Sequence, residues 1–238
     1  MQEKGHLYLI PNTLGDTKLS DILPQGNMDI ILNIKNFIVE DLRTARRFLS
    51  KTGWKGKIDE LSFYLLNEHS RINDIQQHLE QVENGNHIGL LSDAGTPCVA
   101  DPGADIVAMA HERNIRVIPL VGPSSILLSL MASGFNGQNF AFLGYLPREK
   151  GSREKSIKNL ERTALKNDQT QIFIEAPYRN MQILESLLKS CSNDTRICVA
   201  RDITLEDELI ISQSVGEWKK SNFKPDLHKR NTIFLLYK

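Results

Sequence analysis

The chain has 238 residues, of which 40% are hydrophobic and 24% are charged, and this is the composition of an ordinary soluble globular protein. Its 29 basic residues equal its 29 acidic residues in number, which excludes a global positive field, so contacts with nucleic acid would have to come from local patches. Its 3 cysteines are too scattered for a disulfide framework, its 6 histidines lack metal-ligand spacing, and no apolar run approaches the ~20 residues of a membrane span, so we expect a cytoplasmic protein without a metal.

Short apolar runs alternate with helical stretches along the first half of the chain, which predicts an α/β architecture. Strands are expected at Leu7–Ile10, Asn36–Val39, His87–Leu91 and Arg116–Leu120, and helices at Asp41–Lys51, Arg71–Glu83 and Ala104–Arg113. The middle helix carries an apolar stripe at Ile72, Ile75, Leu79 and Val82, which indicates a face that packs on the core. Asn114 is expected to end the last helix in the left-handed conformation.

The second half resumes the alternation after a turn-rich segment at Pro119–Pro123, which we interpret as a hinge. Strands are expected at Phe140–Gly144, Gln171–Glu175, Arg196–Ala200 and Thr232–Tyr237, with a further strand at Ile210–Val215. Helices are expected at Ser125–Ser133, Ser152–Thr163, Arg179–Ser190 and Val215–Lys220. We therefore predict two α/β domains, residues 1–119 and 120–238, with a crevice between them.

The most informative stretch of the chain is a strand that runs directly into a turn of small residues. The strand ends at Leu91, and the turn reads Ser92-Asp93-Ala94-Gly95-Thr96-Pro97. Small residues at such a place let the backbone approach a ligand closely and leave amides free to donate to it. Because ligands of open α/β sheets bind beyond the carboxyl ends of the strands, this turn is a candidate ligand site.

A second turn of the same kind follows the strand at Arg116–Leu120. It reads Gly122-Pro123-Ser124-Ser125 and leads into a helix, whose N-terminus favours anionic groups. A plain structural role is open for both turns, because Ser124 can be a helix N-cap and Asp93 can form an Asx turn. The occurrence of two such turns in succession favours a ligand held by both loops.

Nine short sequence motifs are distributed over most of the chain. They are Leu7–Asp16, Val39–Arg46, Asn67–Ser70, Ser92–Pro97 with Asp101–Gly103, Pro119–Ser125, Ala132–Phe135, Phe142–Arg148, Glu175–Arg179 and Ala200–Thr204. In this order they resemble the S-adenosylmethionine-dependent methyltransferases of the tetrapyrrole methylase fold. The resemblance is greatest to the branch that methylates a cytidine ribose 2′-hydroxyl in 16S ribosomal RNA.

Three motifs depart from that branch, and the connection between the first strand and Asn36 is shorter than in the branch, whereas Ser92–Pro97 and Gly122–Ser125 are intact. Pro11-Asn12-Thr13-Leu14-Gly15-Asp16 stands where the branch has Pro-Thr-Pro-Ile-Gly-Asn. Glu40-Asp41-Leu42-Arg43 replaces Glu-Asp-Thr-Arg, and Glu68-His69-Ser70 replaces Glu-His-Asn. All three lie on the expected substrate side, so the resemblance identifies the cofactor more firmly than the substrate.

The resemblance implies a two-domain class III methyltransferase fold, a homodimer, and S-adenosylmethionine in the interdomain cleft. The cofactor residues that it implies in the first half are Ser92, Asp93, Ala94, Gly95, Thr96, Pro97, Gly122, Ser124 and Ser125. Those that it implies in the second half are Tyr145, Leu146, Pro147, Ala200 and Arg201.

Methyl transfer to a hydroxyl requires a group that takes up the hydroxyl proton. The candidates are Glu40, Asp41, Glu68 and His69, and His69 has the side chain that titrates near neutral pH. The structural alternative is that Glu40 and Asp41 only favour the N-terminus of the helix that follows them.

RNA binding would need local positive charge. Arg43, Arg46 and Arg47, with Lys51 adjoining, are expected to form a basic helix face opposite Leu42, Ala45 and Leu49. A second basic cluster comprises Arg148, Lys150, Arg153, Lys155 and Lys158. Phosphate contacts and a solvated helix face are both open for these clusters.

We therefore expect an rRNA ribose methyltransferase that acts on the small ribosomal subunit. Three alternatives are open: a methyltransferase of the same fold that acts on a macrocycle or a modified protein side chain, a non-catalytic RNA-binding or ribosome-binding module, and an α/β nucleotide binder of other activity.

Overall fold

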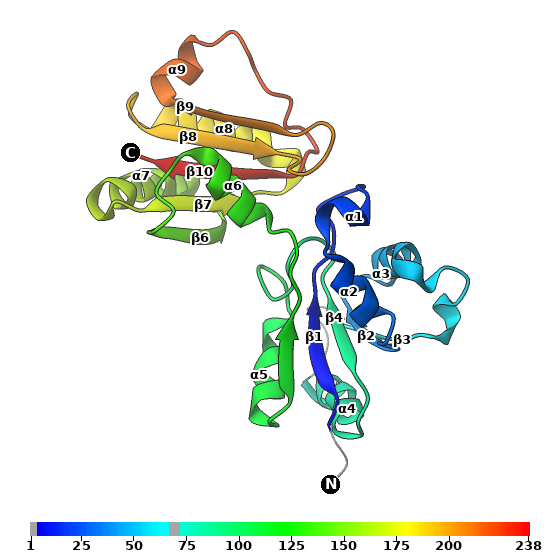
Figure 1. The fold of residues 1–238 in the computed structure, drawn as a ribbon. Helices are drawn as coiled ribbons and strands as arrows, with labels where there is room; N and C mark the ends of the chain where they lie inside the picture. The colour runs from blue at the N-terminus through cyan, green and yellow to red at the C-terminus, as the bar shows by residue number, and fades with distance from the viewer. Residues whose placement is uncertain (1–3, 67–71) are drawn as a thin grey trace. The chain divides into compact units, whose positions relative to one another are not determined.

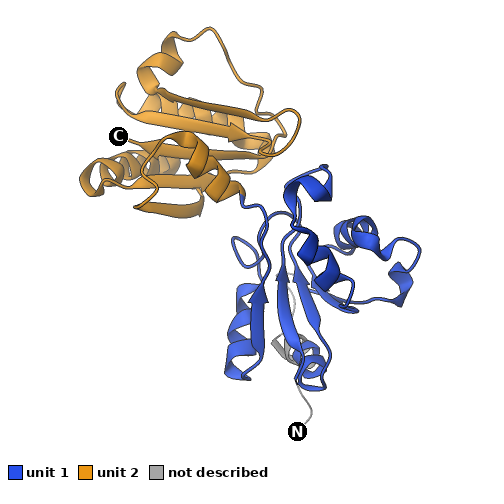
Figure 2. Ribbon diagram, in the orientation of Figure 1, with its two compact units in different colours: residues 1–124 blue, residues 125–238 orange. Residues whose placement is uncertain are grey.

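The computed structural model describes residues 4–66 and 72–238, without the side chains of residues 72–77. The chain forms two compact units, residues 1–124 and 125–238 (Figure 2). The expected boundary lay after Pro119, whereas the units divide between Ser124 and Ser125.

Unit 1 is built on a parallel five-stranded sheet of order β3-β2-β4-β1-β5 (Figure 1). Its strands are β1 (His6–Ile10), β2 (Asn36–Val39), β3 (Ser62–Leu65), β4 (Ile88–Leu91) and β5 (Arg116–Pro119). The connection after β1 leads to β2 on one side, whereas the connection after β4 leads to β5 on the other. The carboxyl ends of β1 and β4 are therefore adjacent at a topological switch point, where open α/β sheets bind ligands.

Helices cover both faces of this sheet. They are α1 (Leu19–Ile22), α2 (Gln25–Ile31), α3 (Leu42–Leu49), α4 (Ile72–Glu83) and α5 (Ala104–Glu112). Ile31, Phe48 and Leu49 from α2 and α3 share one core with Ile10 and Phe37 of the sheet. On the other face, Leu79 and Val82 of α4 and Ile106 of α5 pack with Leu7 and Ile88.

Most predicted elements of unit 1 are confirmed to within a few residues, including the left-handed Asn114 with a φ of 53°. Leu79 and Val82 of the predicted stripe are fully buried, while the side chains of Ile72 and Ile75 lie outside the described part. The sequence reading missed α1, α2 and β3, which are short. The predicted helix at Asp41–Lys51 ends as α-helix at Leu49 and continues as a π-type turn at Ser50–Trp54, where Gly53 has a φ of 116°.

Unit 2 contains a mixed five-stranded sheet of order β6-β7-β10-β8-β9. Its strands are β6 (Phe140–Tyr145), β7 (Thr170–Ile174), β8 (Arg196–Arg201), β9 (Leu209–Ser214) and β10 (Thr232–Tyr237). β6 and β7 are parallel, and each of the pairs β7–β10, β10–β8 and β8–β9 is antiparallel. Consequently β6, β7 and β8 all end at the same edge of the sheet, and the loops after them carry three of the sequence motifs.

The helices of unit 2 lie mainly on one face of its sheet. α7 (Lys150–Asn167), α8 (Asn180–Ser190) and α9 (Val215–Lys220) bury apolar side chains against Phe173, Val199 and Phe234. α6 (Ser125–Ser133) contacts β9 and β10, and the Ser212 hydroxyl donates to the Ser133 carbonyl at 2.7 Å. The predicted strands and helices of this unit are confirmed, and α7 is longer than predicted at both ends.

None of the helices in the described residues combines the length and apolar character needed to cross a bilayer.

Candidate functional site

The turn after β4 is held in place by Asn12, which follows β1. The Asn12 side chain is 4% exposed, and its Nδ2 donates to the carbonyls of Ser92 at 3.3 Å and Asp93 at 3.1 Å. The backbone of Asn12 also exchanges hydrogen bonds with Gly95, at 2.9 and 3.2 Å. This role of Asn12, which lies two residues after β1 where the family pattern has threonine, was not predicted from the sequence.

Two glycines allow the loops at this edge to approach one another. Gly95 has a φ of 72°, and a Cβ added there would lie 3.1 Å from Leu14 Cδ2 and 3.4 Å from the Pro123 carbonyl oxygen. A Cβ on Gly122 would lie 2.2 Å from Pro11 Cγ, which is a clash. The expectation was that a ligand would approach these glycines, but in the structure neighbouring loops do so. The three loops after β1, β4 and β5 therefore lie close together.

Within this group of loops, backbone donors are available to a ligand. The amides of Ala94 and Thr96 donate to no group in the part of the chain that the structure describes, and Ala94 is exposed. The Ser92 hydroxyl is turned back onto the Ala94 carbonyl at 3.2 Å, so it stabilises the turn. Free amides beside the Asp93 carboxylate fit a ligand that carries both acceptor groups and a cation, such as the amino-acid end of S-adenosylmethionine.

The carboxylates near this turn differ in their environments. Glu40, which follows β2, accepts weakly from the Asp93 amide at 3.4 Å. Burial raises the pKa of Glu40, and the charge of Asp101 raises it further. Burial likewise raises the pKa of Asp93, and the charge of Asp41 adds to the effect. Carboxyl groups with raised pKa values at a candidate ligand site are candidates for proton transfer.

Asp41 has a structural role. Its side chain accepts from the Thr44 amide at 2.7 Å and caps α3, and that hydrogen bond lowers its pKa. This capping is the alternative that the sequence left open for Asp41. Asp101 also orders a turn, because one of its oxygens accepts from the amides of Cys98 at 2.8 Å and Gly103 at 2.9 Å. Glu68 and His69, the other two candidate bases, lie outside the described residues.

A cavity of about 390 Å³ opens between the loop after β1 and α3. Its lining includes Thr13, Leu14, Arg47, Lys51 and Asp93. Lys51 forms an ion pair with Asp16 at 2.6 Å across the wall of the cavity. The cavity is therefore lined both by the turn after β4 and by residues of the basic helix α3.

The predicted basic face of α3 is only partly available. Arg43 and Arg47 are exposed, whereas Arg46 is paired with Asp59 and lies over the Phe63 ring. Ala45 and Leu49 are buried as predicted. The expectation that Leu42 lies on the buried face was wrong: it is 37% exposed, because it occupies the first turn of the helix, at the margin of the core.

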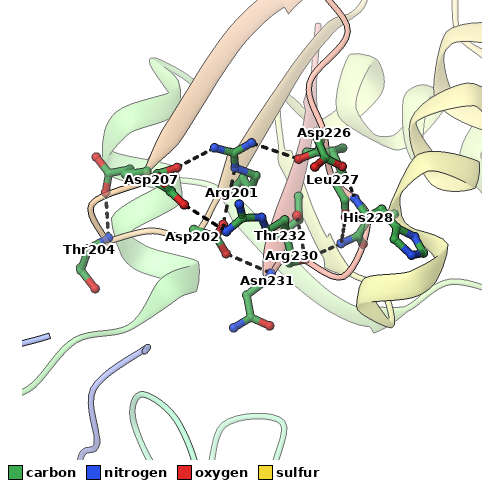
Figure 3. Close-up of polar contacts among 12 residues, drawn as sticks. Arg201, Asp202, Thr204, Asp207, Asp226, Leu227, His228, Arg230, Asn231 and Thr232 are labelled. Atoms are coloured by element: carbon green, nitrogen blue, oxygen red, sulfur yellow. Dashed lines mark hydrogen bonds and ion pairs between the residues drawn. The ribbon is translucent and has the colours of Figure 1, made fainter. Parts of the chain in front are cut away.

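The predicted cofactor residues of unit 2 lie at the edge where β6 and β8 end. Tyr145 and Pro147 are exposed there, whereas Leu146 and Ala200 are buried in the unit. Arg201 is committed to the protein, since its Nη1 donates to the Asp226 carbonyl at 3.0 Å and its Nη2 to that of Asp207 at 2.7 Å (Figure 3). These contacts favour a structural role for the Arg201 guanidinium.

Asp202 extends this network. Its carboxylate accepts from the Asn231 amide at 3.2 Å and pairs with Arg230 at 3.2 Å, and Arg230 also pairs with Asp207 (Figure 3). Asp202 and Thr204 have positive φ values of 49° and 70°. Such values are uncommon for side chains of this kind, so the loop after β8 is held in its conformation by the surrounding ion pairs.

The second basic cluster contains both exposed and buried residues. Arg148 and Lys150 are exposed, but Arg153 is 5% exposed and donates to the Ser186 hydroxyl and the Arg148 carbonyl. The expectation that Arg153 forms part of a solvent-facing patch was therefore wrong, because the packing of α7 on α8 encloses it. No group of three or more His, Cys, Asp or Glu side chains suited to a metal occurs in the described part of the chain.

Known proteins resemble this chain in both sequence and fold. The family model of "Tetrapyrrole (Corrin/Porphyrin) Methylases" matches residues 17–219. "Ribosomal RNA small subunit methyltransferase I" of Vibrio cholerae is 28% identical over 97% of this chain and 76% of its own length. The proteins of the same name from Haemophilus influenzae and Bacillus subtilis are 30% and 31% identical over 90% of this chain, and 72% and 69% of their own lengths.

Solved structures share the fold at low sequence identity. The methyltransferase CobJ is 15% identical, with a TM-score of 0.65 over 98% of this chain and 94% of its own. A uroporphyrin-III C-methyltransferase from Thermus thermophilus, complexed with S-adenyl homocysteine, is 14% identical, with a TM-score of 0.56 over 98% of each chain. These likenesses confirm the predicted α/β fold of two sheets.

Proposed function

The chain belongs to the tetrapyrrole (corrin/porphyrin) methylase family, and from this premise we propose that it methylates RNA of the small ribosomal subunit with S-adenosylmethionine as methyl donor. The observation that carries the proposal is the set of relatives named "Ribosomal RNA small subunit methyltransferase I", which match 90–97% of the chain. A ribosomal substrate would place the enzyme in the cytoplasm.

The acceptor that we propose is a ribose 2′-hydroxyl of a cytidine in 16S ribosomal RNA. The order of the sequence motifs along the chain supports this acceptor, because that order most resembles the branch that methylates it. S-adenosylmethionine supplies an electrophilic methyl group bound to a sulfonium sulfur, and this sulfur is the leaving group, as a neutral thioether. The protein must hold the hydroxyl oxygen in line with that methyl group and accept the proton.

The turn after β4 holds the cofactor in this proposal. The free amides of Ala94 and Thr96 and the carboxylate of Asp93 bind its polar end, and Asn12 keeps the turn in place. We propose that Gly122, Ser124 and Ser125 contribute from the loop before α6, and Tyr145 and Pro147 from the loop after β6. Arg201 contributes by fixing the loop after β8 through its bonds to the Asp226 and Asp207 carbonyls. Leu146 and Ala200 are buried, and they contribute indirectly, as part of the core that supports those loops.

Glu40 is our proposed general base. Its raised pKa and its weak hydrogen bond to the Asp93 amide leave the carboxylate able to accept a proton, whereas Asp41 is engaged as a helix cap. Glu68 and His69 remain alternative bases. Arg43 and Arg47 would contact RNA phosphates beside the cavity.

We further propose that the enzyme is a homodimer and needs no metal. Exposed apolar side chains of unit 2, among them Met131 and Phe140, offer apolar area for contact with a second copy. Light scattering after size exclusion would give the mass of a dimer, and activity would persist in EDTA.

The proposal is tested by transfer of tritiated methyl groups from S-adenosylmethionine to intact 30S subunits. Naked 16S RNA and total protein serve as parallel substrates. Label in the 16S RNA of the subunits supports the proposal. Label only in protein or in a small molecule would favour the other substrates that the fold accommodates.

A further inference from the structure

A second cavity, of about 340 Å³, lies in unit 2 between the start of α7 and α8. Its charged lining consists of four cations, Arg148, Lys150, Arg153 and Lys189, and two carboxylates, Glu154 and Glu185. The lining therefore has an excess of positive charge, in a protein whose net charge is zero.

Arg153 is a buried cation in the wall of this cavity. At 5% exposure, its Nε donates to Ser186 Oγ at 3.1 Å and its Nη1 to the Arg148 carbonyl at 2.9 Å, and both acceptors are neutral. Neither bond uses Nη2, and Arg153 takes part in none of the ion pairs found among the described residues. Because a buried charge without a counter-charge is costly, an anion in the cavity would stabilise this arrangement.

Of the nearby carboxylates, Glu185 is exposed, and the other two are already engaged. Glu154 accepts from Lys189 at 2.9 Å, and this hydrogen bond is the main cause of its lowered pKa. Glu149 caps α7 by accepting from the amides of Gly151 and Ser152, which lowers its pKa to about 2, and the charge of Arg153 contributes least. Arg148, Lys150 and the free nitrogen of Arg153 are therefore left to bind an external anion.

We propose that this cavity binds a backbone phosphate of the RNA substrate, at a place distinct from the methyl-accepting site in unit 1. The inference rests on the proposed function, which supplies the polyanion. The guanidinium and ammonium groups provide the charge-assisted donors that phosphate requires. Lys155 and Lys158, which belong to the same basic cluster in the sequence, do not line the cavity and offer an internal control.

The test compares two triple variants in filter binding of labelled 16S RNA over a series of KCl concentrations. The site variant is Arg148→Ala, Lys150→Ala and Lys189→Ala, which spares the buried Arg153. The control variant is Lys155→Ala, Lys158→Ala and Lys166→Ala, with the same charge change on exposed positions of α7. Thermal melts confirm that both are folded.

Each phosphate contact contributes roughly 0.7–0.9 to the slope of log affinity against log salt. We expect the site variant to lower this slope by about 1–2, and the control variant to lower it by less than half as much. Equal slopes for the two variants would overturn the phosphate site while wild-type methylation of 30S subunits still stood. A wild-type chain that neither binds nor methylates ribosomal RNA would instead overturn the proposed function.

Discussion

Asn12 is the side chain on which the conformation of the turn after β4 depends most. Replacing it with alanine removes three side-chain hydrogen bonds: the two that Nδ2 donates to the Ser92 and Asp93 carbonyls, and the one that Oδ1 accepts from the Thr13 amide. We expect Asn12→Ala to lower the free energy of unfolding by about 1–3 kcal/mol and to weaken S-adenosylmethionine binding. Urea unfolding and calorimetric titration measure the two effects.

The matched control is Asn33→Ala. Asn33 is exposed and makes a single side-chain bond to the Asp29 carbonyl at 2.8 Å. It should change neither quantity appreciably, and equal losses in the two variants would show that Asn12 has no special role.

If Glu40 is the general base, its pKa determines how the activity depends on pH. Because its pKa is raised, wild-type turnover should fall as the pH drops through that raised value. Glu40→Gln should lower kcat by roughly 10²–10⁴-fold and abolish this acidic limb, with cofactor affinity retained. The exposed Glu60→Gln provides the control, and a Glu40→Gln enzyme with the wild-type pH profile would transfer the role to Glu68 or His69.

The stability of the fold gives an independent check on Glu40. A carboxyl whose folded-state pKa is raised stabilises the protein most below its unfolded pKa, and this contribution is lost as the pH rises through the folded value. Glu40→Gln should therefore not lower Tm at neutral pH. Loss of activity with Tm preserved separates a missing base from a damaged fold.

At the scale of elements, α3 brings the cavity and the exposed arginines together. Changing Arg43 and Arg47 to alanine should weaken RNA binding and flatten its salt dependence, with cofactor affinity unchanged. Arg46 is left intact because Asp59 and Phe63 already occupy its guanidinium. The control pair is Lys4→Ala and Arg116→Ala, at the opposite ends of the parallel strands. An unaltered salt slope for the α3 variant would leave its arginines as ordinary solvated side chains.

The missed elements α1, α2 and β3 are four to seven residues long, although strands as short as β2 and β5 were predicted. β3 is only four residues long and pairs with β2 alone, so its existence depends on the neighbouring strand. α1 and α2 are short helices separated by Pro24, and the contacts of their apolar side chains with the core are evident only in the folded unit. The burial of Leu42 was predicted wrongly, because the spacing of apolar residues shows which face of a helix is buried but not how far the core extends along that helix.

The same distinction holds for the candidate site. The turns at Ser92–Pro97 and Gly122–Ser125 are continuous in sequence and could be singled out from their residues alone. The hydrogen bonds that the Asn12 side chain donates join residues 80 or more positions apart, and Arg201 and Arg153 each have one partner at least 25 positions away. Such pairings require the fold.

At the scale of the whole molecule, one cofactor site per chain is expected. Calorimetric titration with S-adenosylmethionine in EDTA should give one site, and a concentration of 100 times Kd should stabilise the folded state by about 2.7 kcal/mol. The Asp93→Ala variant should lose this stabilisation while it unfolds cooperatively. The absence of heat and of any rise in Tm at millimolar cofactor would contradict the proposed site.

The central claim is that the chain methylates a ribose 2′-hydroxyl of small-subunit RNA, and reverse transcription of treated 16S RNA tests it most directly. At low dNTP concentration, reverse transcriptase stalls at a 2′-O-methylated nucleotide. We predict one new stall, at a cytidine, after incubation of 30S subunits with the enzyme and S-adenosylmethionine, and a much weaker stall with Glu40→Gln. Incorporation of methyl label without any new stall would contradict the ribose acceptor, and label found outside the RNA would contradict the ribosomal substrate itself.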